Sequence, residues 1–198
     1  MNLKSLKNNY FILRHGKSSA NEEGIIISDP KNGILSYGLV EEGRQQVKAS
    51  AKKAKEEKVL DKKTIIVSSD FSRALETAEI TREVLGCGQV IVSTKLRERN
   101  FGDWEKTHNS NYQRVWDDDI KDANHKVNND ESAQEVLDRT SSLINDLEEE
   151  YTGKNILLIS HGDALQILQT AFEKVSPSHH RTLRHLETAE IRRLHLKE

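Results

Sequence analysis

Short apolar runs alternate with longer amphipathic stretches along the 198-residue chain. Runs of aliphatic and β-branched residues predict buried strands, and they lie at residues 9–14, 63–69, 89–93 and 154–160. The longer stretches carry apolar side chains every three or four residues, which is the spacing of one helix face. These predicted helices cover residues 41–60, 70–86, 130–151 and 163–175. Near the end, residues 189–196 alternate apolar and polar positions, which predicts an edge strand.

This alternation of strands and helices indicates the fold class. Strands that alternate with helices form a mostly parallel sheet with helices on both faces. We therefore predict an α/β protein, a three-layer αβα sandwich whose sheet is mostly parallel with an antiparallel edge strand. The length suits a single domain over residues 1–198. Residues 101–130 have weak periodicity, and we expect them to form a small cap-like insertion.

The composition excludes several classes of partner. Lys and Arg number 30 against 32 Asp and Glu, so no global charge attracts nucleic acid or a membrane, and any anion site must be local. The single cysteine, Cys87, excludes an internal disulfide and a multi-cysteine zinc site. The first ten residues have no apolar core, and the apolar runs are too short to span a bilayer. We therefore expect a cytoplasmic protein without a signal peptide.

Two of the predicted strands end in the same dipeptide. His15-Gly16 follows the first strand, and His161-Gly162 follows the strand at 154–160. In open parallel sheets, ligands bind beyond the carboxyl ends of the strands. Each glycine allows the backbone to turn sharply and a ligand to approach closely. The two histidines are therefore predicted to meet at one ligand-binding edge.

Other strand ends bring charged side chains to the same edge. Arg14 precedes His15, Arg73 opens the helix after the second strand, and Glu98 follows the third strand. A guanidinium group matches phosphate oxygens with two hydrogen bonds, and a neutral imidazole can attack phosphorus. A protonated carboxyl can donate a proton to a leaving alkoxide. This set predicts phosphoryl chemistry without a metal or cofactor, because the cations offset the phosphoryl charge.

Five segments resemble the motifs of a known family, in the family's order along the chain. They are RHGKSSAN, LVEEGRQQ, SSDFSRALETA, LRERNFGDWE and SHGDAL. With these motifs the chain resembles the histidine phosphatase superfamily, also called the phosphoglycerate mutase-like family. The resemblance implies a phosphoglycerate mutase-like fold and a small phosphorylated substrate.

The resemblance also implies roles for individual residues. His15 would be the nucleophile that forms a phosphohistidine, and Arg14 and Arg73 would bind the phosphoryl oxygens. His161 would stabilise the transferring group. Glu98 would donate a proton to the leaving group and then activate water.

Other motif positions would line the pocket, or have a simpler role. Ser18 and Asn21 would lie near the phosphate, although both could instead cap a following turn. Gly162 would allow the ligand to approach the second histidine. Glu98 could instead pair with Arg97 and Arg99 in a solvated cluster.

Departures from the family pattern favour a phosphatase over a mutase. The mutase branch must hold a second anionic end of its substrate, with a Tyr, a Lys and an Arg-Arg pair. Here Phe101 occupies the Tyr position, Asn109 falls near the Lys position, and the acidic residues 115–122 replace the basic pair. Two alternatives stay open: mutase-type phosphoryl transfer, and a scaffold that binds phosphate with little turnover.

Several further residues have a simple structural interpretation. The acidic run Asp117–Asp119 is expected to be a hydrated surface. His179, His180 and His185 are expected in a solvated loop, because they lack the spacing of metal ligands. Trp104 and Trp116 would pack the insertion or line the pocket. Asp70 is expected to cap the helix that follows it, and Gly86 or Gly88 to end that helix.

Overall fold

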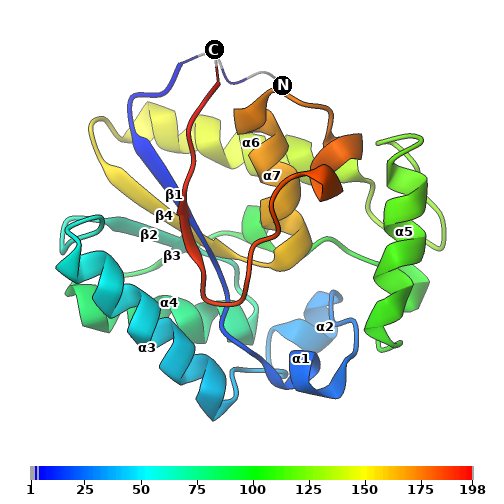
Figure 1. Cartoon of the computed structure of the whole chain (residues 1–198), viewed down its shortest axis with the longest axis horizontal. Helices are drawn as coiled ribbons and strands as arrows, with labels where there is room; N and C mark the ends of the chain where they lie inside the picture. The colour runs from blue at the N-terminus through cyan, green and yellow to red at the C-terminus, as the bar shows by residue number, and fades with distance from the viewer. Residues whose placement is uncertain (1–2, 4, 198) are drawn as a thin grey trace.

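The computed structural model describes residues 3 and 5–197, and a five-stranded sheet lies at the centre of this part of the chain (Figure 1). Its strands are β1 (Asn9–Arg14), β2 (Ile65–Ser68), β3 (Ile91–Val92), β4 (Asn155–Ser160) and β5 (Ile191–Arg193). They lie in the order β3-β2-β4-β1-β5. β1 to β4 pair in parallel, and β5 pairs antiparallel to β1 at the edge. The predicted fold class is therefore confirmed.

Two pairs of helices cover the sheet, one pair on each face (Figure 1). They are α3 (Glu41–Glu56) with α4 (Ser72–Leu85), and α6 (Ala133–Glu150) with α7 (Gly162–Glu173). Successive residues of β1 divide between the two layers, because side chains alternate along a strand. Phe11 and Leu13 pack with α3 and α4, whereas Tyr10 and Ile12 pack with α6 and α7. A strand buried on both faces reads as a continuous apolar run, which is how β1 and β4 appear in the sequence.

Shorter elements complete the carboxyl edge of the sheet. They are α1 (Ser19–Glu23), α2 (Pro30–Gly33), α5 (Tyr112–Asp119), and the 3-10 helices η1 (Thr94–Leu96), η2 (Gly102–Trp104), η3 (Asn109–Asn111) and η4 (Pro177–Thr182). The stretch 101–130, where the sequence has weak periodicity, contains η2, η3 and α5. It has a small apolar cluster of its own, in which Phe101 and Val115 pack with Ile26.

Element ends differ in places from the sequence prediction. Gly86 ends α4 in the left-handed conformation, as expected. The expected Asp70 cap is wrong: Phe71 is the residue before α4, and Asp70 instead accepts hydrogen bonds from Arg97. The helix expected over 41–60 ends at Glu56. The predicted strand 89–93 pairs only at two residues, because it lies at the sheet's edge.

No helix among residues 3 and 5–197 combines the length and the apolar character needed to cross a membrane.

Candidate active site

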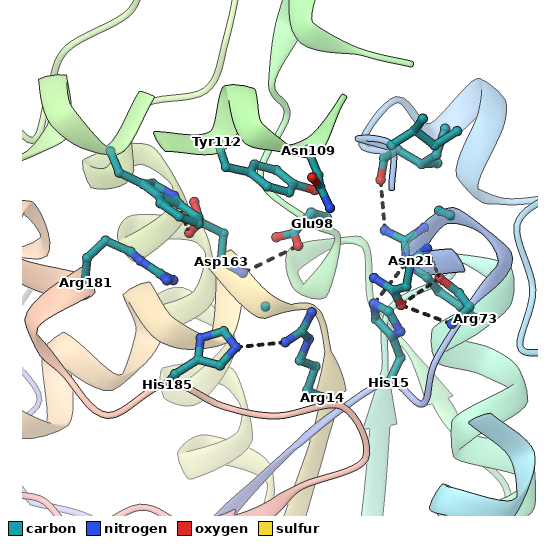
Figure 2. A pocket seen from close by; sticks show the side chains of 16 residues that line it. Arg14, His15, Asn21, Arg73, Glu98, Asn109, Tyr112, Asp163, Arg181 and His185 are labelled. Carbon is teal, nitrogen blue, oxygen red and sulfur yellow. Dashed lines mark hydrogen bonds between the residues drawn. The ribbon is translucent and has the colours of Figure 1, made fainter. Parts of the chain in front are cut away.

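His15 directly follows β1, and its side chain lies close to those of Arg14 and Arg73 (Figure 2). Nδ1 lies 2.8 Å from the carbonyl oxygen of Gly16. A carbonyl only accepts hydrogen bonds, so Nδ1 carries the proton and donates. Nε2 then has the lone pair, and it accepts from Nε of Arg73 at 3.1 Å. Burial, with the charges of Arg73 and Arg14, holds the pKa of His15 well below its ordinary value. The ring is therefore neutral, and its nucleophilic nitrogen faces a guanidinium.

The cations around His15 are anchored by some of their atoms and leave others free. Arg14 donates from Nη1 to the carbonyl of Leu186 at 2.9 Å, and Arg73 donates from Nη2 to the carbonyl of Ile27 at 2.9 Å. Among the described residues, buried Nε of Arg14 and Nη1 of Arg73 find no hydrogen-bond partner. Buried donors are rarely left unpaired in proteins. These two guanidinium groups are therefore arranged to bind an anion in the cavity that both line.

His161 lies against His15, with ring centroids 5.2 Å apart. Its Nε2 is within 2.9 Å of Oγ of Ser69, and its Nδ1 has no partner among the described residues. Burial and the charge of Arg73 hold the pKa of His161 well below the ordinary value. His161 itself is neutral in the free protein, and the neighbouring Gly162 lines the cavity.

Glu98 projects into the same cavity from the segment after η1. Its Oε1 accepts from the backbone N–H of Arg99 at 2.9 Å and of Ala164 at 3.0 Å. The alternative pairing with its two flanking arginines does not occur, because Arg97 binds Asp70 and Arg99 binds Asp119. Burial and the nearby negative charge of Asp163 raise the pKa of Glu98. The Glu98 carboxyl therefore stays protonated to a higher pH than an ordinary carboxyl group.

Ser18 and Asn21 cap α1, as one sequence interpretation predicted. Ser18 is the N-cap of α1, and Asn21 forms the reciprocal hydrogen bond of a capping box, with Oδ1 accepting from the Ser18 backbone at 3.0 Å. Both residues also line the cavity. The cap therefore fixes their side chains at the cavity wall.

The loop after β1 is held by close contact with α3. A Cβ atom on Gly16 would lie 2.5 Å from the carbonyl oxygen of Gly43, and one on Gly43 would lie 2.0 Å from that of Lys17. Neither position can therefore carry a side chain without moving the backbone. This contact explains the glycine in the LVEEGRQQ segment at the start of α3.

The far wall of the cavity includes Tyr112 and Arg181, which the sequence did not single out (Figure 2). Tyr112 and Trp116 come from α5 and stack, with ring centroids 5.5 Å apart and planes inclined by 10°. The two residues are four apart in the sequence, which is the only sequence signal that both rings share one helix face. Trp116 lines the cavity, which agrees with its pocket-lining interpretation. Arg181, in η4, lies over Trp116, with the guanidinium carbon 3.7 Å from the ring centroid. His185 accepts from Arg14 across 3.2 Å. The cavity encloses about 220 Å³.

Tyr112 provides a hydroxyl at this wall, although Phe101 lacks one. The two rings meet edge to face at 4.7 Å. Burial and the charge of Glu98 raise the pKa of Tyr112, so the hydroxyl stays protonated. The side chain of Asn109 also lines this wall.

A buried ion cluster attaches the far wall to α7. Arg99 forms two hydrogen bonds with Asp119, at 2.5 and 2.8 Å, and its side chain and that of Asp119 are fully buried. Asp163, at the start of α7, lies 3.4 Å from Arg99 and 3.5 Å from His180. Burial opposes ionisation of Asp163, but His180 and Arg99 outweigh it and hold its pKa low. Trp116 completes the cluster by donating from Nε1 to Asp163 at 3.0 Å.

This cluster corrects two sequence interpretations. Asp119 was expected on a hydrated surface, and His180 in a solvated loop. Both are fully buried, because each faces an oppositely charged or polar group from a distant segment: Arg99 for Asp119 and Asp163 for His180. The exposed His179 fits the solvated-loop expectation. Across residues 3 and 5–197, no group of three or more His, Cys, Asp or Glu side chains is arranged to hold a metal ion.

The geometry and the motifs define the class of protein. The chain belongs to the histidine phosphatase superfamily (branch 1), whose pattern it matches over residues 10–198. Among curated relatives, the probable phosphoglycerate mutase GpmB of Escherichia coli is 33% identical over 165 residues, which are 80% of this chain and 71% of that protein.

Solved structures show the same fold. A mycobacterial glucosyl-3-phosphoglycerate phosphatase in complex with VO3 is 26% identical with a TM-score of 0.78, over 93% of this chain and 91% of that chain. YhfR of Bacillus stearothermophilus is 28% identical with a TM-score of 0.75, over 93% and 89% of the two chains.

Proposed function

We propose that the protein is a metal-independent phosphatase that hydrolyses a small phosphomonoester through a phosphohistidine on His15. One observation carries this proposal: a neutral imidazole, with its lone pair on Nε2, shares a buried cavity with two guanidinium groups that have unpaired donors. These cations offset the charge of the phosphoryl group, which is the main requirement for its transfer.

In the first step, Nε2 of His15 attacks phosphorus. The N–P bond forms while the ester P–O bond breaks, and the leaving oxygen takes the proton of Glu98. The raised pKa of Glu98 favours the protonated form that this step needs. Arg73 exchanges its hydrogen bond to Nε2 for one to a phosphoryl oxygen, and its unpaired Nη1 and Nε of Arg14 bind the others.

In the second step, water attacks the phosphohistidine. Glu98, now a carboxylate, accepts a proton from the water, and the oxygen forms a bond to phosphorus as the N–P bond breaks. Inorganic phosphate leaves, and both His15 and Glu98 return to their starting states. His161, whose ring lies against that of His15 and whose Nδ1 is unpaired, would donate to the transferring group once protonated, and the charge of that group would itself favour the protonation.

The remaining cavity residues have supporting roles in this proposal. Ser18 and Asn21 contact the phosphate end, and Gly162 leaves room for it. The chain would form one histidine phosphatase domain over residues 1–198, with 101–130 as its cap. We propose the cytoplasm as its compartment, where a free, buried thiol such as Cys87 stays reduced.

Mutase-type transfer is the second candidate function, and the position of Arg181 supports it. The sequence argument against a mutase rests on an acidic insertion that cannot hold a second anionic end. In the folded chain Asp119 is neutralised by Arg99, and Arg181 adds a cation to this wall. A relative named as a mutase and a neighbour named as a phosphatase agree with either reaction.

The test is hydrolysis of 4-nitrophenyl phosphate with a chelator present. We expect turnover by the wild type and by His179→Ala, whose exposed ring is the matched control, and none by His15→Ala. Mass spectrometry should detect acid-labile phosphate on His15. Binding of phosphate without turnover or phosphohistidine would indicate the scaffold instead. Transfer to a hydroxyl acceptor in preference to water would indicate the mutase.

A further inference from the structure

One cation of the cavity has no part in the proposed reaction. Arg181 lies in the last turn of η4 and lines the same cavity as Arg73. Figure 2 shows the two side chains at opposite sides of the cavity, with the guanidinium of Arg181 directed inward and Arg14 between them. Arg181 is therefore positioned away from the nucleophile but within reach of the same small ligand.

The guanidinium of Arg181 keeps its donors available. Within residues 3 and 5–197, its side chain makes no hydrogen bond and has no carboxylate within 4.0 Å. By contrast, Arg97 and Arg99 are bound by carboxylates, and Arg14 is anchored by a carbonyl. A half-buried arginine without a partner at a cavity wall is suited to bind an anionic ligand.

The position of Arg181 is nevertheless fixed. Its guanidinium lies on the face of Trp116, at the separation of a close cation–π contact. Trp116 is itself held by the hydrogen bond to Asp163 and by the stacked ring of Tyr112. The cation is therefore preorganised, so a ligand does not have to order it on binding.

Asp163 offsets part of the charge of Arg181, which contributes to lowering the pKa of Asp163, but it does not bind the guanidinium. Its oxygens are already engaged by Trp116, Arg99 and His180. The positive charge of Arg181 also disfavours the charge on Arg14 and contributes to lowering its pKa. Arg14 and Arg181 thus face the same cavity, and a ligand with a negative charge at each end would reduce the repulsion between them.

We propose that Arg181 selects substrates that carry a second anionic group, such as a carboxylate, close to the phosphate ester. This inference rests on the proposed phosphoryl site and adds the class of substrate. The phosphate end binds at Arg14 and Arg73 beside His15, and the second anion binds at Arg181. Arg14, Arg73 and Arg181 line one cavity, so both anionic groups belong to one ligand and the second group lies close to the ester.

The test compares two phosphonates that the enzyme cannot hydrolyse: 3-phosphonopropionate, and propylphosphonate, which has a methyl group in place of the carboxylate. Calorimetry measures the Kd of both compounds for the wild type and for Arg181→Gln. We expect the wild type to bind the carboxylated compound about 10- to 100-fold more tightly, the usual range for a charge-assisted hydrogen bond. In Arg181→Gln the ratio should fall to about one, with the affinity for propylphosphonate unchanged.

Two further variants separate selection from a structural role. Arg184→Gln removes an exposed arginine three residues away and should keep the wild-type ratio. Arg181→Lys keeps the charge without the planar fork and should give an intermediate ratio. A purely structural Arg181 would change the affinities for both phosphonates together, and their ratio would stay constant.

The outcomes distinguish this inference from the proposed function. Equal binding of both phosphonates by the wild type, or a ratio that survives Arg181→Gln, would overturn the role of Arg181 alone. Failure of both phosphonates and of inorganic phosphate to bind would overturn the phosphoryl site and the inference with it.

Discussion

The two ends of the cavity are built in different ways. The phosphate end comes from strand ends and helix starts: Arg14 ends β1, His15 follows it, and Arg73 lies in the first turn of α4. The far end comes from α5 and η4, which lie outside the sheet, and a buried ion cluster joins them to α7. The proposed reaction would therefore depend on residues at the edge of the sheet, whereas the proposed substrate selection would depend on polar contacts between irregular segments.

The largest expected effect is at the phosphate end. Arg73→Gln removes both the donor facing Nε2 of His15 and an anion contact. Loss of one such donor costs about 10²–10³ in rate, and with two functions lost we expect kcat/KM for 4-nitrophenyl phosphate to fall by about 10³. Arg82→Gln, on the same helix but outside the cavity, is the control. A loss below tenfold would contradict the role of Arg73.

The next largest effect on activity is expected for Glu98→Gln, which removes the proposed proton donor. We expect kcat to fall by about 10²–10³ for substrates with poor leaving groups, because an amide cannot protonate the leaving oxygen. The wild-type rate should decline at high pH, above the ordinary carboxyl range, as Glu98 loses its proton. The rate should also decline at low pH, at values below the ordinary pKa of histidine, because the pKa of His15 is lowered. An alkaline limb that persists in Glu98→Gln would contradict this assignment.

The stability of the same variant should depend on pH. The folded-state pKa of Glu98 is raised, so this carboxyl stabilises the fold when protonated, and that contribution is lost as pH rises through the folded-state pKa. The free energy of unfolding of Glu98→Gln, relative to the wild type, should therefore increase with pH from the ordinary carboxyl pKa upward. Urea denaturation at pH 4.5 and pH 8 measures this difference. A relative stability that falls with pH would have the wrong sign.

The far end should be the more fragile part of the structure. Asp119→Asn leaves Arg99 buried with one charge partner fewer, and breaking a buried ion pair costs about 3–5 kcal/mol. We expect a loss near the lower limit, because Asp163 remains close to Arg99. Urea denaturation measures the loss, and Asp117→Asn, on the same helix, is the control. A change below about 0.5 kcal/mol, the range of ordinary surface substitutions, would contradict the structural role.

The smallest expected effect concerns the support of Arg181. Trp116→Phe keeps an aromatic face but removes the hydrogen bond to Asp163. We expect the preference for 3-phosphonopropionate over propylphosphonate to fall by about three- to fivefold, since Trp is the strongest cation–π partner. Hydrolysis of 4-nitrophenyl phosphate should change less than twofold. A larger effect on this reaction than on the preference would show that the two ends are not independent.

The same comparison explains what the sequence could predict. The phosphate end was predictable because strand ends meet at one edge by topology, so motifs at 14–16, 73, 98 and 161–162 predict one site. The fold followed from the periodicity of the apolar runs. The far end was not predictable, because the partners of Asp119 and His180 are distant in sequence, and no local pattern distinguishes a buried charge from a hydrated one. Arg181 lies in a polar connection whose path depends on those contacts.

The contact of Gly16 with Gly43 gives the nucleophile loop a mechanical property. The carbonyl oxygen of Gly43 and Cγ2 of Val47 both lie where a side chain on Gly16 would begin, so the loop packs directly on α3. The amide of Val40 also donates to the carbonyl of Lys17 at 3.1 Å, next to the start of α3. The loop cannot yield alone, so a displacement of His15 must move the first turn of α3 with it. His15 is thus held through contact with a 16-residue helix, and slow exchange of the Val40 amide, which donates to Lys17, should report how rigidly His15 is held.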